Sequence, residues 1–146
     1  MFDVAEERVA GYREGLGPAW DENAVRTAMP NAPEPARTGA LELLGGSDRP
    51  SAILAMTDPF AVGVLHAAEL VPAEFSVVGF DDSSAAHLAS PPLTTVAQPH
   101  VEKGRLAAEW LIDDIARGAG RRRRRPAILP TELVGRESTA PNTARR

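Results

Sequence analysis

Three carboxylates stand directly after two short apolar runs of this chain, and they are its first candidates for chemistry. Asp58 follows the run 51–56, and the pair Asp81 and Asp82 follows the run 75–80. Adjacent carboxylates repel each other, so one of a pair usually turns to a partner while the other turns elsewhere. Three roles stay open for this pair: binding the hydroxyls of a ligand, holding Mg²⁺, or serving as acids of a loop without chemistry.

Asp58 also has a local structural explanation. The order Thr57-Asp58-Pro59 predicts the first turn of a helix, with Asp58 as the N-cap and Pro59 as the first helical residue, because both residue types are strongly preferred there. Thr57 ends the preceding apolar run, where its hydroxyl can face a ligand. Thr57 and Asp58 are therefore candidate ligand-binding residues, with a helix cap as the alternative for Asp58.

The chain lacks the common signatures of catalysis and of metal binding. It contains no G-x-x-x-x-G-K-[ST] loop for phosphates and no G-x-S-x-G turn for a nucleophilic serine. The three histidines, His66, His87 and His100, are scattered and form no H-x-x-x-H pair. These absences predict a protein that is not an enzyme and that has no metal site and no cofactor.

The elements that position the carboxylates form a strand-helix-strand unit. Both apolar runs are short and continuous rather than alternating, which is typical of strands buried on both faces. A helical segment at 59–70 separates them, and such units join parallel strands. Asp58 and the pair Asp81–Asp82 should therefore lie at one edge of the sheet, the edge at which open α/β sheets bind ligands.

Other elements surround this unit. The patterns predict helices over 4–16, 35–44 and 100–117, a short strand over 24–29, and extended chain over 93–97 and 128–134. Alternating helices and strands predict an α/β layered fold. The helix at 100–117 carries an apolar stripe for which the chain supplies little to pack on.

Length and composition point to one domain. The chain has 146 residues, 43% of them apolar, which suffices for a core. It has no cysteine, no apolar run long enough to cross a membrane and no signal-peptide pattern at its start, so we expect a cytoplasmic protein without membrane contact. The net charge is −4 although Arg121–Arg125 are consecutive arginines, so the remaining surface is acidic and poorly suited to nucleic acid. We interpret the arginine run as a solvated loop.

Several segments occur together, and in this order, in one protein family. PSAILAMTD followed by FAVG, then VPAEFSVVGFDD, SPPLTTVAQP and LPTELVGREST, resemble the C-terminal part of the LacI/GalR (lactose-repressor) family of bacterial transcription regulators. AEERVAGYREGL resembles the family's R-x-x-G-[YFW]-x-x-x-L helix through Arg8, Gly11, Tyr12 and Leu16. Each motif alone is modest, but the collinear set covers residues 4–139 and is specific.

The resemblance implies a two-lobed sensor with the type I periplasmic-binding-protein fold. This chain would hold one Rossmann-like lobe with a parallel sheet and little of the second lobe. The implied division is 1–92 as the C-terminal lobe, 93–97 and 128–139 as segments that cross between the lobes, 98–127 as a fragment of the N-terminal lobe and 140–146 as a disordered tail. The missing packing partner of helix 100–117, and a helix-turn-helix domain, would lie outside the chain, as in a truncated regulator.

The resemblance also implies site residues. Asp81 matches the family carboxylate that binds effector hydroxyls, and Thr57 stands where the family most often has asparagine. Arg26 lies close to the place of a ligand-contacting arginine, although Thr27 is the residue at the matching position. Asn31, in the loop that follows, is a further candidate ligand-binding residue.

The function implied by the resemblance is the sensing of a small effector, a sugar or polyol, by a LacI-type regulator. Lobe closure on the ligand would shift paired DNA-binding heads, with operator DNA bound through a domain absent from this chain. The helix at 59–70 resembles one that contributes to the family's dimer interface, which implies a homodimer. Two alternatives stay open: a sugar-binding component of a transporter with the same fold, and a Mg²⁺-dependent phosphate-transfer enzyme that uses Asp81 and Asp82.

Overall fold

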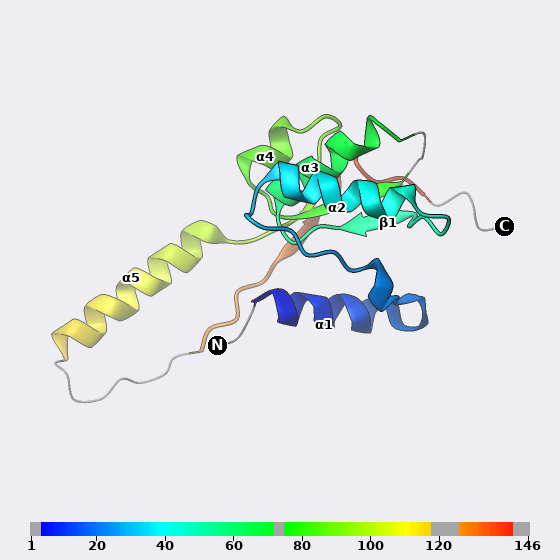
Figure 1. Cartoon of the computed structure of the whole chain (residues 1–146). Coiled ribbons are helices and arrows are strands. Elements are labelled where there is room, and N and C mark those ends of the chain that lie inside the picture. The colour runs from blue at the N-terminus through cyan, green and yellow to red at the C-terminus, as the bar shows by residue number, and fades with distance from the viewer. Residues whose placement is uncertain (1–3, 72–74, 118–125, 142–146) are drawn as a thin grey trace.

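The computed structural model of the chain describes residues 4–71, 75–117 and 126–141 (Figure 1). The arginine run and most of the expected tail lie outside the described residues. Two short 3₁₀ helices, Gly17–Ala19 and Glu22–Ala24, precede α2. The longer elements are, in order, α1 (Val4–Leu16), α2 (Pro33–Gly45), β1 (Ala52–Leu54), α3 (Asp58–Ala68), β2 (Ser76–Asp81), α4 (Ser84–Leu88), β3 (Thr94–Ala97), α5 (His100–Ala116) and β4 (Glu132–Val134).

The strands form one sheet in the order β1-β2-β3-β4. β1 pairs with β2, and β2 with β3, in parallel, whereas β4 is antiparallel to β3. This register aligns Leu54 with Val78 and Asp81 with Ala97, so the carboxyl ends of the parallel strands meet at one edge. The predicted strand-helix-strand unit, its parallel pairing and the α/β class are confirmed.

The core lies between the sheet and helices α2 and α3. These helices and α4 group on one side of the sheet, and α1 lies apart from them below the sheet in Figure 1. Leu44 of α2, Val77 of β2 and Leu93, just before β3, are the largest fully buried apolar side chains. The side chains of α3 in this core are Ala61, Val64, Leu65 and Ala67.

The close packing of α2 on α3 depends on Gly63. A Cβ atom added to Gly63 would lie 2.8 Å from the carbonyl carbon of Pro33 and 3.0 Å from the amide nitrogen of Arg37, and closer still to the Pro33 oxygen. Only glycine permits such an approach of two backbones. Pro33 occupies the first turn of α2, where its fixed φ favours the helix. The helix therefore begins before residue 35, the predicted start.

The start of α3 differs from the prediction by one residue. Thr57, not Asp58, is the N-cap, and its hydroxyl accepts a hydrogen bond from the amide of Phe60 at 3.4 Å. Asp58 is the first helical residue and has no exposed surface. The prediction that a polar side chain caps this helix is correct, but the cap is Thr57. The Asp58 carboxylate does not cap the helix because it bonds to Ser83 and Thr95.

The strand predicted at 24–29 is wrong. Residues 22–24 form a 3₁₀ helix, and residues 25–28 belong to no helix and to no strand of the described sheet. The guanidinium of Arg26 donates to the carbonyl oxygens of Asn23 at 2.7 Å and Val25 at 2.9 Å. The second of these local bonds occupies a carbonyl of the segment that was expected to pair. The short helix α4 was not predicted, β1 is shorter than the run 51–56, and the strand within 128–134 is limited to β4.

A hollow of about 420 Å³ separates α1 from β1 and α2. It is lined by apolar side chains that include Val9 and Leu16 of α1, Leu43 of α2 and Ile53 of β1. No residue of α1 is fully buried. Tyr12, also in this lining, is half-buried, and burial raises the pKa of its phenol while the nearby charge of Arg8 partly opposes that effect.

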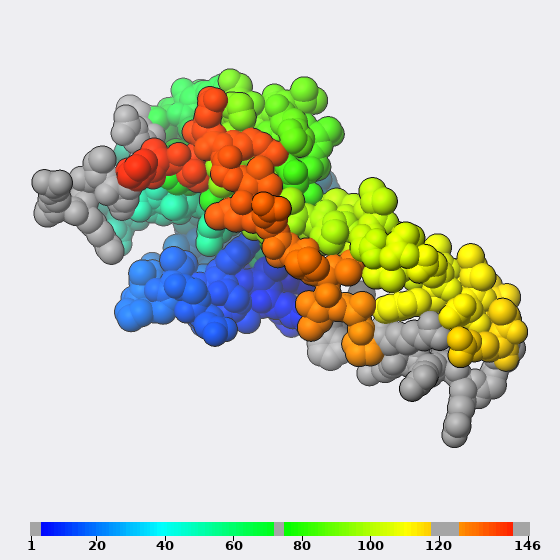
Figure 2. All heavy atoms as spheres, turned by 180° about the vertical axis from the view of Figure 1, so that it is seen from behind, coloured from blue at the N-terminus to red at the C-terminus, as the bar shows by residue number. Residues whose placement is uncertain are grey.

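Helix α5 projects from the rest of the molecule as an arm (Figures 1 and 2). Its apolar stripe is exposed: Leu111 and Ile112 retain 62% and 65% of their surface, and Ile115 retains 71%. The expectation that this stripe has little to pack on is confirmed for the described residues. None of the helices described is long and apolar enough to cross a membrane.

We expect Gly63→Ala to lower the free energy of unfolding by at least about 2 kcal/mol, because the new methyl group forces α2 and α3 apart. Urea unfolding followed by circular dichroism measures the loss. Gly104→Ala is the matched control, since a Cβ on Gly104 of α5 meets nothing within 4 Å. The control should be neutral or stabilising. An equal loss in both variants would contradict the packing role of Gly63.

Tyr12 is the single tyrosine of the chain, so the near-ultraviolet absorbance of tyrosinate reports its titration alone. We expect a midpoint above the ordinary value of about 10 in the folded chain, and a return to that value in concentrated guanidinium chloride. The folded state then binds the proton more tightly than the unfolded state. The contribution of Tyr12 to the free energy of unfolding is therefore fully present below the pKa that Tyr12 has in the unfolded chain. It is lost as the pH rises through the higher pKa of the folded chain. Identical midpoints in both states would contradict burial of Tyr12.

Candidate functional site

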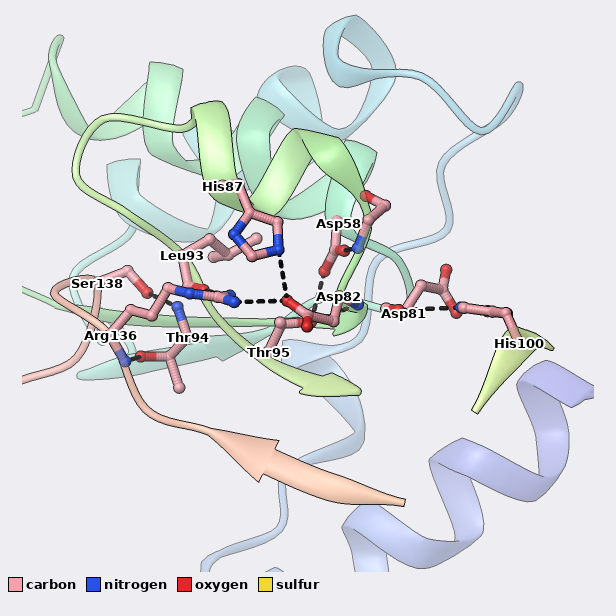
Figure 3. Close-up of polar contacts among 11 residues, drawn as sticks. Asp58, Asp81, Asp82, His87, Leu93, Thr94, Thr95, His100, Arg136 and Ser138 are labelled. Atoms are coloured by element: carbon pink, nitrogen blue, oxygen red, sulfur yellow. Dashed lines mark hydrogen bonds and ion pairs between the residues drawn. The ribbon is translucent and has the colours of Figure 1, made fainter. Parts of the chain in front are cut away.

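Polar side chains converge where the parallel strands end (Figure 3). Asp58 lies at the centre of this edge, and both of its oxygens accept short hydrogen bonds. Its Oδ2 accepts from the amide of Ser83 at 2.6 Å, and its Oδ1 accepts from the hydroxyl of Thr95 at 2.6 Å. The structure thus brings Asp58 and the segment after β2 together, as the parallel strands predicted.

Asp82 is held by side chains from two other segments. Arg136 follows β4 in the chain. Its guanidinium donates to Asp82 Oδ1 at 2.6 Å and to the carbonyl of Leu93 at 2.7 Å. His87 of α4 places Nε2 at 3.4 Å from the same Asp82 oxygen. These contacts give Asp82 a structural role, and they tie the segment after β4 to the turn that follows β2.

Asp81 turns away from Asp82 toward the segment that leaves β3. Its Oδ1 accepts a hydrogen bond from the side-chain amide of Gln98 at 2.6 Å, and its backbone carbonyl accepts from His100 Nε2 at 3.0 Å. Lys103 in turn donates to Gln98 at 2.5 Å. The two adjacent carboxylates therefore take separate partners, as their mutual repulsion predicted.

Asn31 and Thr57 form a second polar contact of the candidate set. The hydroxyl of Thr57 donates to Asn31 Oδ1 at 2.6 Å. This bond leaves the NH₂ group of Asn31 as a donor, because an amide side chain carries both a carbonyl oxygen and donor hydrogens. The loop that contains Asn31 is thereby joined to the end of β1, although Asn31 and Thr57 are 26 residues apart in the chain.

Arg26 is placed elsewhere. Besides its local carbonyl partners it forms an ion pair with Glu42 of α2, with Nε 3.3 Å from the carboxylate. It also lies against Gly39 of the same helix. None of these contacts reaches Asp81, so the structure does not group Arg26 with the other candidates.

The structure instead brings Arg8 to the strand ends. Its guanidinium lies 3.6 Å from the centre of the Phe80 ring, in a cation–π arrangement, and donates to the carbonyl oxygen of Met56. Arg8 of α1 therefore bridges the ends of β1 and β2. Sequence reasoning used Arg8 only as part of a helix motif, because spacing along α1 does not show which strands the helix meets.

Three candidate residues near the strand ends keep groups that a polar organic ligand could bind. Acceptor oxygens come from Asp81, and donor hydrogens come from Asn31 and Arg8, each held in place by a neighbour. Within the described ranges, no three side chains of histidine, cysteine, aspartate or glutamate come together in a way that could hold a metal ion. The arrangement suits a ligand that both donates and accepts hydrogen bonds.

Comparison with known proteins places the chain in a family. A model described as a periplasmic binding protein-like domain matches residues 3–139. The chain is 34% identical over 143 residues to the HTH-type transcriptional regulator DegA of Bacillus subtilis, covering 93% of this chain and 41% of DegA. It is 38% identical over 126 residues to the ribose operon repressor of Escherichia coli, covering 76% of this chain and 36% of the repressor.

Solved structures agree with this assignment. A LacI-family regulator of Sanguibacter keddieii superposes with a TM-score of 0.83 at 31% identity, covering 92% of this chain and 54% of the other. The chain belongs to the LacI-type family of periplasmic binding protein-like domains. The family resemblance inferred from the motifs is confirmed, and this LacI-type chain spans less than half the length of curated relatives such as DegA.

Two further LacI-type neighbours were solved with sugars. The regulator CelR in complex with cellobiose gives a TM-score of 0.78 at 32% identity, covering 91% of this chain and 42% of CelR. A LacI-family regulator of Arthrobacter in complex with lactose gives 0.72 at 33% identity, covering 95% of this chain and 51% of the other.

We expect Arg136→Gln to lower the free energy of unfolding by about 2 kcal/mol, since it removes the cation from a largely buried carboxylate. The side chains of Arg136 and Asp82 are only 16% and 24% exposed. Arg105→Gln is the control, because its ion pairs with Glu102 and Glu109 are exposed on α5 and such pairs contribute little. Chemical denaturation compares the two, and equal effects would contradict the structural role of Arg136.

Proposed function

We propose that this chain is the sugar-sensing part of a LacI-type transcription regulator. The observation that carries the proposal is the placement of Asp81. Its carboxylate stands at the carboxyl edge of the parallel sheet, in hydrogen-bonding contact with one amide side chain and no cation among the contacts of the described residues. A carboxylate with free acceptor positions binds pairs of sugar hydroxyls strongly and directionally.

The surrounding residues suit the same ligand. We propose that Arg8 and Asn31 donate hydrogen bonds to ligand oxygens, that Thr57 orients Asn31, and that Arg26 has no part in binding. Sugars present hydroxyl groups that donate and accept, so a site with a carboxylate on one side and NH groups on the other can satisfy both functions. The cellobiose and lactose complexes of related regulators, and the ribose operon repressors among the relatives, support a sugar.

The regulatory role rests on the family and on parts of a longer protein. We propose that residues 1–92 act as one lobe and that the segments around β3 and β4 cross to a second lobe, which closes on the ligand. Closure then alters DNA binding by a separate domain, through a shift between two conformations. Such a regulator works in the cytoplasm.

We also propose that the chain forms a homodimer through α3. The outer face of α3 meets α4 around a shallow hollow of about 290 Å³. Val62 and His66 of α3 and Leu88 of α4 line this hollow, and Leu88 is 84% exposed. Ala85 and Ala89 line the same hollow beside Val62 and Leu88, and a contiguous group of apolar side chains rimmed by polar groups is typical of an association surface.

The proposal predicts sugar binding that depends on Asp81. Titration of the chain with ribose, cellobiose and lactose, followed by NMR of the backbone amides, should shift the signals of Asp81 and its neighbours for at least one sugar. Asp81→Asn should weaken that binding by about tenfold or more, because an amide accepts fewer hydroxyl hydrogen bonds than a carboxylate.

Asp48→Asn is the matched control, since Asp48 lies in the exposed loop between α2 and β1, at the opposite end of β1. It should bind the same sugar as the parent chain does. If none of the three sugars shifts the Asp81 region, or if both variants bind equally, the proposed function is wrong.

A further inference from the structure

The turn after β2 has a backbone that needs support. Asp81 and Asp82 both have positive φ, 113° and 52°. Residues other than glycine reach this region at a cost in free energy, and they keep it only where the surroundings hold them. Because the same turn presents the Asp81 carboxylate, whatever holds the turn also sets the direction of that side chain.

One buried carboxylate supports two backbone amides at the turn. Asp58 accepts directly from the amide of Ser83. Its other oxygen accepts from the Thr95 hydroxyl, whose oxygen in turn accepts from the amide of Asp82 at 3.4 Å. Two consecutive backbone amides are thus held from one side chain, one of them directly and the other through Thr95.

The Asp58 carboxylate is closely packed by its neighbours. Asp58 and Thr95 have no exposed surface. A Cβ atom on Gly79 of β2 would lie 2.5 Å from Asp58 Oδ1 and 2.8 Å from the side chain of Leu93. Glycine at this point of β2 therefore leaves the space that the carboxylate fills. Asp58 also lies in the first turn of α3, where the helix dipole favours a negative charge.

The other contacts of the turn are of a different kind. Gln98 and His100 belong to the segment that leads into α5, and Arg136 follows β4. Gln98 and His100 lie at the root of the projecting arm, whereas Arg136 lies on the segment beyond β4. Asp58 and Thr95 instead belong to the packed body of sheet and helices, so they hold the turn independently of those segments.

We propose that Asp58 is the positioning residue of the ligand site: it never touches the ligand, but it holds the Asp81–Asp82 turn so that the Asp81 carboxylate faces the sugar. The part of this inference that concerns the sugar rests on the proposed function. The part that concerns support of the turn by Asp58 does not. It assigns to Asp58 a role distinct from both a helix cap and a ligand contact.

The test uses the 146-residue chain and four variants. Asp58→Asn removes an acceptor without changing shape, Thr95→Val removes the relaying hydroxyl, and Thr95→Ser keeps it. Ser138→Ala is the matched control, because the buried Ser138 hydroxyl also joins two groups, the amide of Thr94 and the carbonyl of Val77, but toward the amino ends of β2 and β3.

Amide hydrogen exchange measures the turn without any ligand. We expect the amides of Asp82 and Ser83 to exchange about tenfold faster in Asp58→Asn and Thr95→Val, with Thr95→Ser close to the parent chain. Ser138→Ala should lower the melting temperature and leave these two amides unchanged. Unchanged exchange in Thr95→Val would overturn the hold on the turn, and this variant carries the test if Asp58→Asn does not fold.

Titration with whichever of ribose, cellobiose or lactose the parent chain binds measures the effect on the site. We expect about tenfold weaker binding in Asp58→Asn and Thr95→Val, and parent affinity in Thr95→Ser and Ser138→Ala. Equal weakening in Ser138→Ala, or parent affinity in a variant whose turn is loosened, would overturn the positioning role. If the parent chain binds none of the sugars while the turn amides respond as expected, the proposed function fails and the hold of Asp58 on the turn stands.

Discussion

The edge of the sheet is organised around a carboxylate that has no contact with water. Asp58 starts α3 directly after β1, and it bonds to Thr95 of β3 and to the amide of Ser83 beyond β2. One side chain therefore fixes three strand ends and a helix start relative to one another. A polar group so deeply buried is tolerated only when its hydrogen bonds are made, and Ser83 and Thr95 meet that requirement for Asp58. Gly79 leaves the space that the carboxylate occupies.

Packing is uneven around this centre. α2, α3 and β2 form a close-packed body in which Gly63 and Pro33 bring two backbones together. α1 encloses a hollow, and α5 keeps its apolar stripe in solvent. Segments with few buried contacts open at low free energy, whereas a packed body resists deformation. The candidate site lies where the two kinds of structure meet, since Asp81 faces Gln98 at the root of the α5 arm.

The chemistry of the site follows from which groups are already occupied. Asp82 is paired with Arg136 and Asp58 is enclosed, so Asp81 is the carboxylate that we propose for the ligand. Arg8, stacked on Phe80, supplies a cation close to the same strand end. Sugar-bound regulators among the structural neighbours show that this family architecture holds such ligands in related proteins. The separation of a structural acid from the acid proposed to face the ligand connects the fold to the proposed function.

The sequence alone determined the features that depend on near neighbours. Helix periodicity and apolar runs identified α1, α3, α5 and β2, and parallel pairing brought the carboxylates to one edge. The collinear motifs identified the family. The tertiary structure decided the role of each acid, because Asp58 and Thr95 are 37 residues apart and no local pattern links them. It also removed the expected strand at 24–29, since a strand requires a partner as well as a propensity, and it brought Arg8 to Phe80. Local preferences act within a few residues, whereas the hydrogen bonds that shape the proposed site join distant segments.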